Sequence, residues 1–315
     1  MQIFHNANFN FIKWRWHALG ISLAIVWGGL GWMFTHGGIP MGIDFTGGTV
    51  VVVEFPQATH EDVVRKALDP VSHDAVVQAY GRETGKNRLM VRLPEALGQE
   101  SGASLEADAK KVEAALKTAN LNPLIISKTI VGPQVGKDLQ SKGWRALLTS
   151  LGGIMIYVAF RFRLTFAVGA VIATFHDIFI TVVFLWLFHY DMSLNIIAAI
   201  LTIAGYSVND TIVVFDRVRE NLRTMRREPL DEVVNVSVNQ TLGRTIITSG
   251  VTFLAVLALY LFGGEVLRGF AFTMMIGVIT GTYSTVFIAA AIAIILSRRT
   301  AAQTGPAGKA RTARA

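Results

Sequence analysis

The sequence predicts a polytopic α-helical membrane protein with six transmembrane helices and an α+β domain inserted between the first two. Two observations lead to this fold class. Long apolar runs recur along the 315 residues, and charged residues make up only 16% of the chain, against about 25% in soluble domains. In addition, the polar stretch between the first two runs alternates strand-like and helix-like segments.

Each apolar run is near or above the roughly 17–25 residues that a helix needs to cross a bilayer core. The runs cover residues 18–34, 144–160, 164–188, 194–215, 245–262 and 270–296. The first follows two basic residues, as a secretory signal would, but it is long, and THGGIPMG after it offers no small-residue cleavage pattern. We therefore expect an N-terminal segment 1–17, a retained span 18–35, five further spans within 143–296, and a disordered basic tail 297–315.

Basic residues in the short loops predict the orientation of the spans. Two precede the first run, two separate the second and third, six arginines lie in the loop 216–244, and two follow the sixth run. The opposite short loops, HYDMS and GGEVLRG, hold one arginine between them. Both termini are thus expected in the cytoplasm, and segment 36–142 outside. The formal charge of +7 then reflects topology and contact with membrane lipid, and no nucleic-acid partner is expected.

The outer segment predicts a small α+β domain. Strands are expected at 49–55, 74–80, 88–93 and 124–131, and helices at 58–69 and 105–116. This β-α-β-β-α-β order is the split arrangement called ferredoxin-like, a fold that serves many functions and implies none by itself. Before the first strand, the motif GIDFTGG contains Gly42, Asp44, Gly47 and Gly48. It predicts a turn that feeds the strand, with a hinge as a further possibility.

Two spans carry ionisable residues well inside their apolar runs. His176 and Asp177 lie halfway along the third run, and Asn209 and Asp210 lie in the cytoplasmic half of the fourth. A carboxylate at mid-bilayer costs about 2.5–3.5 kcal/mol on insertion scales, so it normally faces a bundle interior or a water-filled cavity. Adjacent side chains on a helix point about 100° apart. We therefore expect His176 and Asp177 to hydrogen-bond to neighbouring spans and not to each other.

Asp210 belongs to a polar stripe, because Thr202, Tyr206 and Asn209 recur on the same helix at helical spacing. A matching stripe on the fifth span comprises Thr241, Thr245, Thr248, Ser249 and Thr252. Arg244 stands at the cytoplasmic edge of this stripe. If the stripes face each other, a carboxylate whose proton affinity depends on the distance of an arginine can load and release a proton. Two alternatives stay open: Asp210 is a structural carboxylate that joins helices, and Arg244 is an interfacial residue whose head group reaches water.

Small residues recur at four-residue intervals in the sixth span, namely Gly269, Thr273, Gly277, Gly281 and Thr285. Such spacing lets helices approach closely. We interpret this stripe, with Gly277 and Gly281 at its centre, as a packing surface.

Several long motifs resemble, in order, those of the SecF family of protein translocase subunits, part of the SecD/SecF group related to RND transporters. They are GIDFTGGT after the first run, FHDIFIT in the third, GYSVNDTIVVFDRVREN in the fourth, NQTLGRTIITSG before the fifth and FGGEVLRGFAF before the sixth. The resemblance implies an accessory subunit of bacterial Sec export in the inner membrane, paired with SecD, which contributes six further spans. The pair would use proton flow to complete the export of preproteins that arrive through SecYEG, with YajC and YidC as further partners.

The resemblance places the family's proton-path aspartate on Asp210 and its functional arginine on Arg244. We group Asn209 and Tyr206 with them because of the polar stripe. The secondary polar sites considered are His176, Asp177 and Thr248. No catalytic residue, metal site or cofactor is expected beyond the protons themselves, and the absence of cysteine excludes cysteine-based metal sites.

Two other functions are compatible with parts of the sequence. A scaffold subunit would hold its partner in place without moving protons, and would need the packing glycines but not the polar stripe. An intramembrane aspartyl protease would use Asp177 and Asp210 as paired acids. The usual GxGD motif of such proteases is missing, and SVND stands at Asp210 instead.

Overall fold

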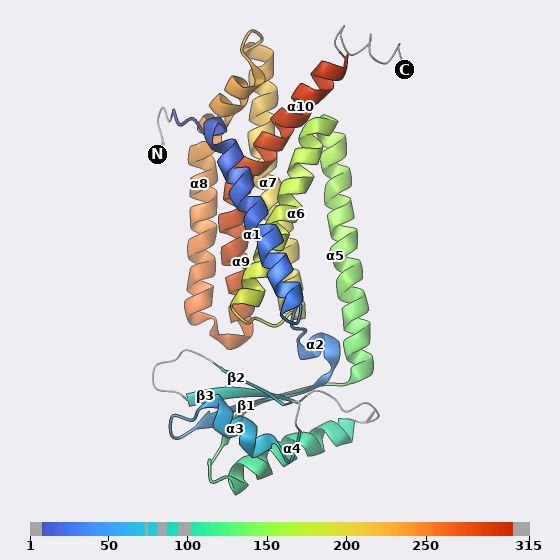
Figure 1. Ribbon diagram of the computed structural model, residues 1–315, viewed down its shortest axis with the longest axis vertical. Helices are drawn as coiled ribbons and strands as arrows, with labels where there is room; N and C mark the ends of the chain where they lie inside the picture. Colours follow the sequence, from blue (N-terminus) through green and yellow to red (C-terminus); the bar gives the residue numbers. More distant parts are fainter. Residues whose placement is uncertain (1–7, 73–74, 81–86, 94–101, 305–315) are drawn as a thin grey trace. The chain divides into compact units, whose positions relative to one another are not determined.

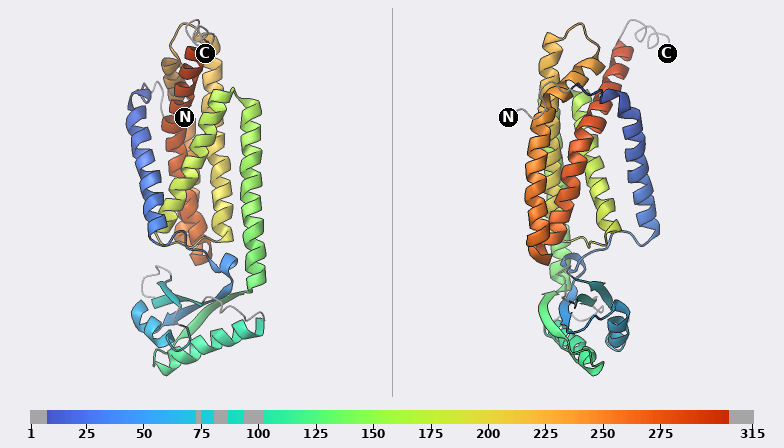
Figure 2. Two further views of the ribbon diagram at one scale, coloured as in Figure 1. Left: turned by 45° about the vertical axis from the view of Figure 1, so that its right-hand side comes forward. Right: turned by 90° about the vertical axis from the view of Figure 1, so that its left-hand side faces the viewer.

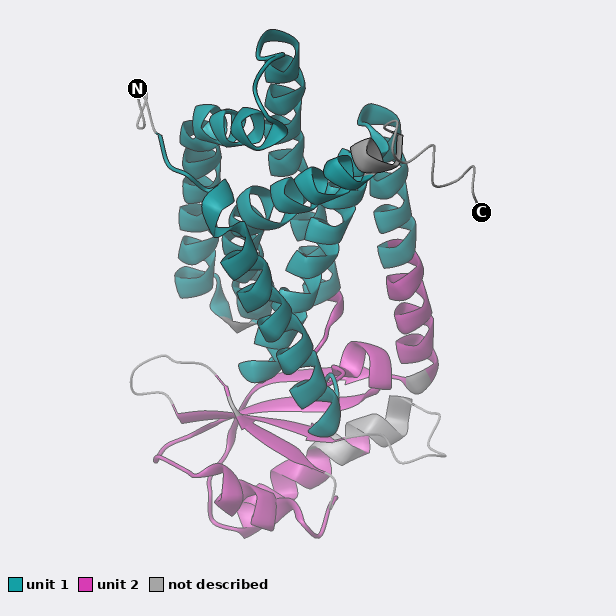
Figure 3. Cartoon of the chain, turned by 45° about the horizontal axis from the view of Figure 1, so that its top comes forward, with its two compact units in different colours: residues 1–39, 147–190, 195–315 teal, residues 40–146, 191–194 magenta. Residues whose placement is uncertain are grey.

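The computed structural model describes residues 8–72, 75–80, 87–93 and 102–304. The chain forms two compact units (Figure 3). One, the helical unit, comprises residues 1–39, 147–190 and 195–315, and the other, the outer domain, comprises residues 40–146 and 191–194. The four residues 191–194 therefore belong to the outer domain although they lie between two spanning helices.

Within the described residues, six helical spans are long and apolar enough to cross a membrane, which confirms the predicted number. A short 3₁₀ helix, η1 (Ile12–Trp14), leads into the first. The spanning helices are α1 (Arg15–Thr35), α5 (Pro133–Arg161), α6 (Leu164–Leu187), α7 (Leu194–Thr224), α8 (Leu230–Phe262), and a last span built from α9 (Gly264–Ser284), the π-helical turn η2 (Thr285–Ala289) and α10 (Ala290–Thr304) (Figures 1 and 2).

The helical unit has a buried centre and a more open periphery. Side chains of α6, α7 and the α9–α10 span are largely buried, whereas α1, α5 and α8 turn most of their side chains outward. Small residues permit the close approach in the centre. A Cβ added at Gly277 of α9 would overlap the side chain of Ile203 on α7, and one at Gly169 of α6 would meet the carbonyl oxygen of Ala289 at 2.7 Å. The predicted packing role of the sixth span rests on such contacts.

Several helices extend beyond the apolar runs that predict them. Helix α5 begins at Pro133, ten residues before the expected limit, and only residues 225–229 separate α7 from α8 where a loop 216–244 was expected. The expectation of a disordered tail from residue 297 is wrong for residues 297–304, which continue α10, while residues 305–315 lie outside the described part. Charged residues end a membrane-spanning run without ending the helix, and Pro229 caps the start of α8.

The outer domain has the predicted βαββαβ order. Its elements are α2 (Ile43–Thr46), β1 (Gly48–Phe55), α3 (Glu61–Leu68), β2 (Val76–Ala79), β3 (Asn87–Leu93), α4 (Gly102–Thr118) and β4 (Leu124–Val131). The strands form one antiparallel sheet in the order β2-β3-β1-β4. Helices α3 and α4 cover one face of it (Figure 1), where Val51 and Val91, paired across β1 and β3, pack with Leu68 and Leu116.

Candidate proton-transfer site

Asp210 is a buried carboxylate with unmet hydrogen-bond capacity. It lies on α7 in the interior of the helical unit, with 7% of its surface exposed. Its Oδ1 accepts a hydrogen bond of 2.7 Å from the hydroxyl of Thr245 on α8. Its Oδ2 is buried and has no hydrogen-bond partner among the described residues. The ionised form of a buried carboxylate is unfavourable when one of its oxygens has no hydrogen-bond partner. Binding a proton at that oxygen removes the charge.

The two predicted polar stripes meet at α7 and α8. Besides the contact of Asp210 with Thr245, the hydroxyl of Tyr206 donates to the hydroxyl oxygen of Ser249 on α8 at 3.2 Å. Ser249 also accepts a hydrogen bond of 2.7 Å from Thr282 of α9. A continuous seam of hydroxyl groups therefore lines α7, α8 and α9 beside the carboxylate.

The remaining predicted site residues lie outside this seam. Asn209, Arg244 and Thr248 are exposed at the surface of the helical unit. The Thr248 hydroxyl donates to the carbonyl of Arg244 on its own helix at 2.9 Å. Within the described part of the chain, Arg244 forms no ion pair with Asp210, but it directly precedes Thr245, the donor to that carboxylate, and its charge acts on Asp210. The sequence predicted the seam, and the structure leaves the exposed side chain of Arg244 at its border.

Asp177 is a second buried carboxylate, and its hydrogen bonds are complete. It lies on α6 with no exposed surface. Its Oδ1 pairs with Nδ1 of His176 at 2.9 Å, and its Oδ2 accepts hydrogen bonds from Ser207 of α7 at 2.5 Å and Ser284 of α9 at 2.7 Å. Gly281 makes this possible, because a Cβ there would lie 3.3 Å from the Cβ of Ser207.

The expectation that His176 and Asp177 do not pair is wrong. Their Cβ atoms diverge along the helix, but Nδ1 sits close to the root of the imidazole ring, and the short aspartate turns one oxygen toward it. The expected bonds to neighbouring spans also exist, through Ser207 and Ser284. The sequence analysis does not predict a role for these two serines. Ser207 lies three residues before Asp210, on a neighbouring line of the same helix, and that spacing was the available signal.

A π-helical turn begins beside the Asp210 carboxylate. Thr285, its first residue, faces the Asp210 carboxylate. Its hydroxyl bonds to the carbonyl of Gly281 at 3.0 Å and to the hydroxyl of Thr211 on α7 at 3.0 Å. Single π-helical turns interrupt α-helices mostly at functional sites.

No group of three or more histidine, aspartate or glutamate side chains in the described ranges is arranged to hold a metal ion. The carboxylates and hydroxyl groups of this site can bind and transfer protons.

Comparison with known proteins identifies the family. A family model described as "Protein export membrane protein SecD/SecF, C-terminal" matches residues 111–299. Relatives named "Protein translocase subunit SecF" include that of Escherichia coli O157:H7, 41% identical over 92% of this chain and 88% of the relative, and that of Pseudomonas aeruginosa, 42% identical over 91% of each. The chain belongs to the SecF family.

A solved structure supports the SecF-family fold. The crystal structure of SecDF, a translocon-associated membrane protein from Thermus thermophilus, covers 95% of this chain at 34% identity with a TM-score of 0.83. A second SecDF structure, in a form described as super-membrane-facing, superposes with a TM-score of 0.68. This chain matches 40% of the length of that SecDF chain.

A second family model, the SecD/SecF GG motif, matches residues 32–58 of this SecF-family chain, which include GIDFTGG. Residues Ile43–Thr46 form the one-turn helix α2, a more regular structure than the predicted turn. Gly47 and Gly48 then turn the chain into β1 with φ of 73° and 118°, a region that favours glycine.

The GG motif also holds the segment 191–194 inside the outer domain. The Gly42 N–H donates to the Met192 carbonyl at 2.7 Å, and a Cβ at Gly42 would lie 2.7 Å from that oxygen. Asp44 Oδ2 accepts a hydrogen bond of 2.9 Å from the N–H of Leu194, the first residue of α7. Arg92 of β3 forms an ion pair with Asp191, and burial lowers the pKa of Arg92 from its usual value. The ordinary pKa of arginine is so high that it stays charged.

Proposed function

We propose that this chain is the SecF subunit of a proton-driven complex with SecD that promotes preprotein translocation and release across the bacterial cytoplasmic membrane. The observation that carries the proposal is the half-paired carboxylate of Asp210, buried between α7 and α8 and bordered by a seam of hydroxyl groups. The SecF-family relatives and the SecDF structures support the protein-export part of the proposal.

In the proposed cycle, Asp210 takes up a proton at Oδ2 while Thr245 holds Oδ1. Neutralising the carboxylate removes the penalty of a buried charge, so the protonated and ionised states favour different packings of α7 against α8. One charge that crosses 100 mV supplies about 2.3 kcal/mol, which biases a two-state equilibrium by roughly fiftyfold. Arg244 favours release of the proton in the state that brings its guanidinium toward the carboxylate, since a nearby positive charge stabilises the ionised form.

The outer domain is the part proposed to act on the preprotein. The bond from Leu194 to Asp44 ends the segment that the outer domain holds, and α7 continues from Leu194 to Asp210 along a single helix. We propose that movements of α7 pass through residues 191–194 to the GG motif. The motif then serves as an anchor for α7, in addition to any role as a hinge.

The proposed setting is the inner membrane, with both termini cytoplasmic and residues 36–142 periplasmic. SecD is the proposed partner, because the solved SecDF chain is much longer than this one and this chain matches only part of it. SecYEG, YajC and YidC remain proposed partners on the family resemblance.

The test compares Asp210→Asn with Asp216→Asn in membrane vesicles that contain the chain together with SecD. Asparagine at position 210 keeps the shape and the acceptor for Thr245 but cannot exchange a proton, so proton-dependent stimulation of export and proton flux should both be lost while the complex still assembles. Asp216→Asn makes the same chemical change farther along α7, at a carboxylate paired with Arg161, and should leave both nearly unchanged. Normal proton-driven export by Asp210→Asn would refute the proposal, and would favour the scaffold alternative.

The geometry disfavours the protease alternative. A protease of this type needs two carboxyl groups that share a proton. Asp177 and Asp210 have separate hydrogen-bond partners, and both oxygens of Asp177 are engaged by His176, Ser207 and Ser284.

A further inference from the structure

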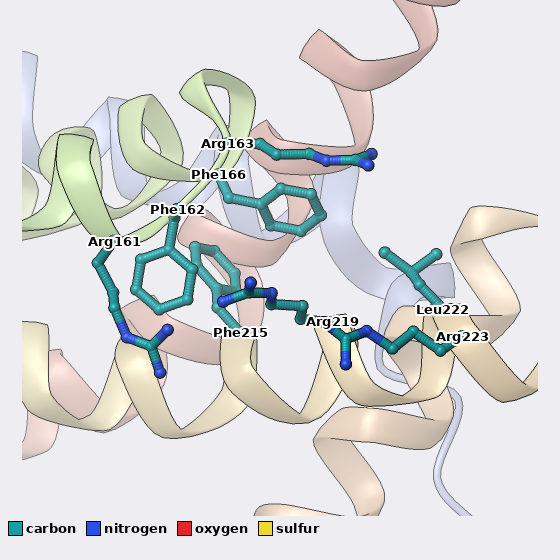
Figure 4. A pocket seen from close by; sticks show the side chains of 8 residues that line it. All are labelled: Arg161, Phe162, Arg163, Phe166, Phe215, Arg219, Leu222 and Arg223. Carbon is teal, nitrogen blue, oxygen red and sulfur yellow. The ribbon is translucent and has the colours of Figure 1, made fainter.

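A basic pocket lies at one end of the helical unit, away from both carboxylates. It has a volume of about 600 Å³, within the range of about 300–1,000 Å³ usual for ligand sites. The residues that line it are Arg161, Phe162, Arg163, Phe166, Phe215, Arg219, Leu222 and Arg223. They come from the end of α5, the connection to α6, the first turn of α6 and the last third of α7 (Figure 4).

The pocket has an apolar floor and a charged rim. Phe166 and Phe215 are buried and meet edge to face with ring centroids 5.1 Å apart, and Phe162 joins them at 6.0 Å from Phe215. Figure 4 shows these rings grouped together with the arginine head groups around them. Only the guanidinium of Arg161 is neutralised, by Asp216 at 2.9 Å.

The other three arginines of the rim form no ion pair within the described residues. These are Arg163, Arg219 and Arg223. Arg219 and Arg223 stand four residues apart on α7, a spacing at which like charges repel. Neighbouring basic residues at the same end of the unit are paired, as Arg15 and Arg298 are with Asp231. Three guanidinium groups without an ion pair among the described residues therefore line one pocket.

We propose that this pocket binds the phosphodiester head group of an anionic phospholipid. Guanidinium groups bind phosphate oxygens through paired N–H donors, and basic pockets between transmembrane helices accept such head groups. The phenylalanine floor suits the first carbons of the acyl chains. The residues lie where the apolar runs of the second, third and fourth spans end, at the depth of lipid head groups. A free phosphate ion would bind the arginines but would make no favourable apolar contact with the phenylalanine floor.

The test is a lipid titration of the purified SecDF complex followed by native mass spectrometry. Delipidated complex is titrated with palmitoyl-oleoyl phosphatidylglycerol or phosphatidylcholine. We expect selective retention of phosphatidylglycerol, and about thirtyfold weaker binding in Arg219→Gln/Arg223→Gln, on the scale of one basic contact per residue. The matched control Arg226→Gln/Arg227→Gln removes the same charge from the connection beyond the pocket, and should change binding by less than twofold.

Three outcomes would overturn the lipid proposal. The first is equal loss of affinity in both double variants, which would indicate a diffuse charge effect. The second is equal binding of phosphatidylcholine. The third is displacement of phosphatidylglycerol by millimolar inorganic phosphate, which would indicate a site for a small anion. The lysine pair Arg219→Lys/Arg223→Lys keeps the charge but loses the paired N–H donors, so it should bind more tightly than the glutamine pair and more weakly than the unchanged protein, which separates loss of charge from misfolding.

A different observation supports a second inference, which rests on the proposed function. A line of polar side chains, made of two hydrogen-bonded groups, runs from α6 to α7. In the first group, Asp177 pairs with His176 and accepts from Ser207 and Ser284. In the second, Thr285 pairs with Thr211 and faces Asp210. Ser284 and Thr285 are consecutive, and Ser207 and Thr211 are one turn apart on α7. Buried atoms without a partner among the described residues, His176 Nε2 and Asp210 Oδ2, stand at its two ends.

We infer that Asp177 is a second proton-holding group that exchanges protons with Asp210 along these hydroxyl groups. A proton that enters at His176 Nε2 allows the proton on Nδ1 to pass to Asp177, and the hydroxyl groups then hand one on toward the free oxygen of Asp210, each accepting one proton and releasing another. The ionisable and phenolic groups that face this line are His176, Asp177, Asp210 and Tyr283, the last with its ring centroid 6.3 Å from that of His176, and the charge of Arg244 on α8 also acts on Asp210.

Asp177→Asn tests this inference in parallel with Asp210→Asn. The asparagine keeps an acceptor for the two serines, so the thermal midpoint should hold while proton flux falls at least tenfold and its pH profile changes. Full flux with an unchanged pH profile in Asp177→Asn, alongside lost flux in Asp210→Asn, would overturn this inference alone. Retained flux in Asp210→Asn would instead refute the proposed function.

Discussion

Asp177 and Asp210 are two buried carboxylates in one helical unit, and their surroundings differ in kind. Asp177 is fully enclosed and both of its oxygens accept hydrogen bonds. Asp210 has one paired oxygen and one without a partner among the described residues. A satisfied buried network fixes the packing of the helices that supply its donors, whereas an unsatisfied group keeps the capacity to gain a proton or a partner. Unmet hydrogen-bond capacity therefore distinguishes Asp210, which has an open oxygen, from Asp177, which is proposed to exchange protons through the groups that it already contacts.

The largest difference should appear on truncation. Asp177→Ala removes the shared acceptor of His176, Ser207 and Ser284, and should lower stability by about 2–4 kcal/mol, since each buried donor left unpaired costs roughly 1–3 kcal/mol and Ser284 also reaches the Gly281 carbonyl. Asp210→Ala removes the acceptor of the Thr245 hydroxyl alone, and should lower the free energy of unfolding by less than about 1 kcal/mol. Unfolding of the two variants in one detergent measures both. Equal losses of stability would mean that the different hydrogen bonding of Asp177 and Asp210 has no energetic consequence.

Helix packing should show the same asymmetry with a smaller effect. In Gly277→Ala, the new methyl group meets the Ile203 side chain in the buried centre, and overpacking of this kind costs about 1–3 kcal/mol. Gly250→Ala on α8 places its methyl group in open space, so it should be neutral or slightly stabilising. Thermal midpoints of the two variants provide the comparison. A Gly277→Ala variant as stable as Gly250→Ala would contradict the close packing of α9 against α7 at Gly277.

The hydroxyl that donates to Asp210 should affect proton transfer more than stability. Thr245→Val keeps the shape and removes the hydrogen bond, which is worth about 1 kcal/mol and so about fivefold in proton flux. Thr245→Ser restores the donor and should restore the flux. A valine variant with normal flux would mean that the free oxygen alone sets the behaviour of Asp210.

The smallest effect should follow Tyr206→Phe. It removes the bond to Ser249, but Ser249 still accepts a hydrogen bond from Thr282. Hydrogen bonds inside membrane proteins average about 0.6 kcal/mol, so stability should change by about that amount and proton flux by less than twofold. A large loss of proton flux would instead indicate that Tyr206 is part of the proton path.

The sequence predicted which residues could carry the function better than it predicted their contacts. Asp210 was found because a carboxylate inside an apolar run is costly, and its stripe with Tyr206 followed from helical spacing. Helical spacing predicts Arg244 at the seam, and the structure leaves its side chain exposed on α8 while its charge still acts on Asp210. The pairing of His176 with Asp177 was rejected on backbone geometry, and side-chain rotamers overturned that argument.

The sequence alone determined the six spans, the βαββαβ order of the outer domain and the position of the buried carboxylates, because hydrophobic length and periodicity are local properties. Tertiary structure decided which oxygen of each carboxylate is paired, that residues 191–194 join the outer domain through Asp44 and Arg92, and that three unpaired arginines surround one pocket. These features depend on groups far apart in the chain, such as Ser284 beside Asp177. Only the packing of the helices brings such groups within hydrogen-bond distance.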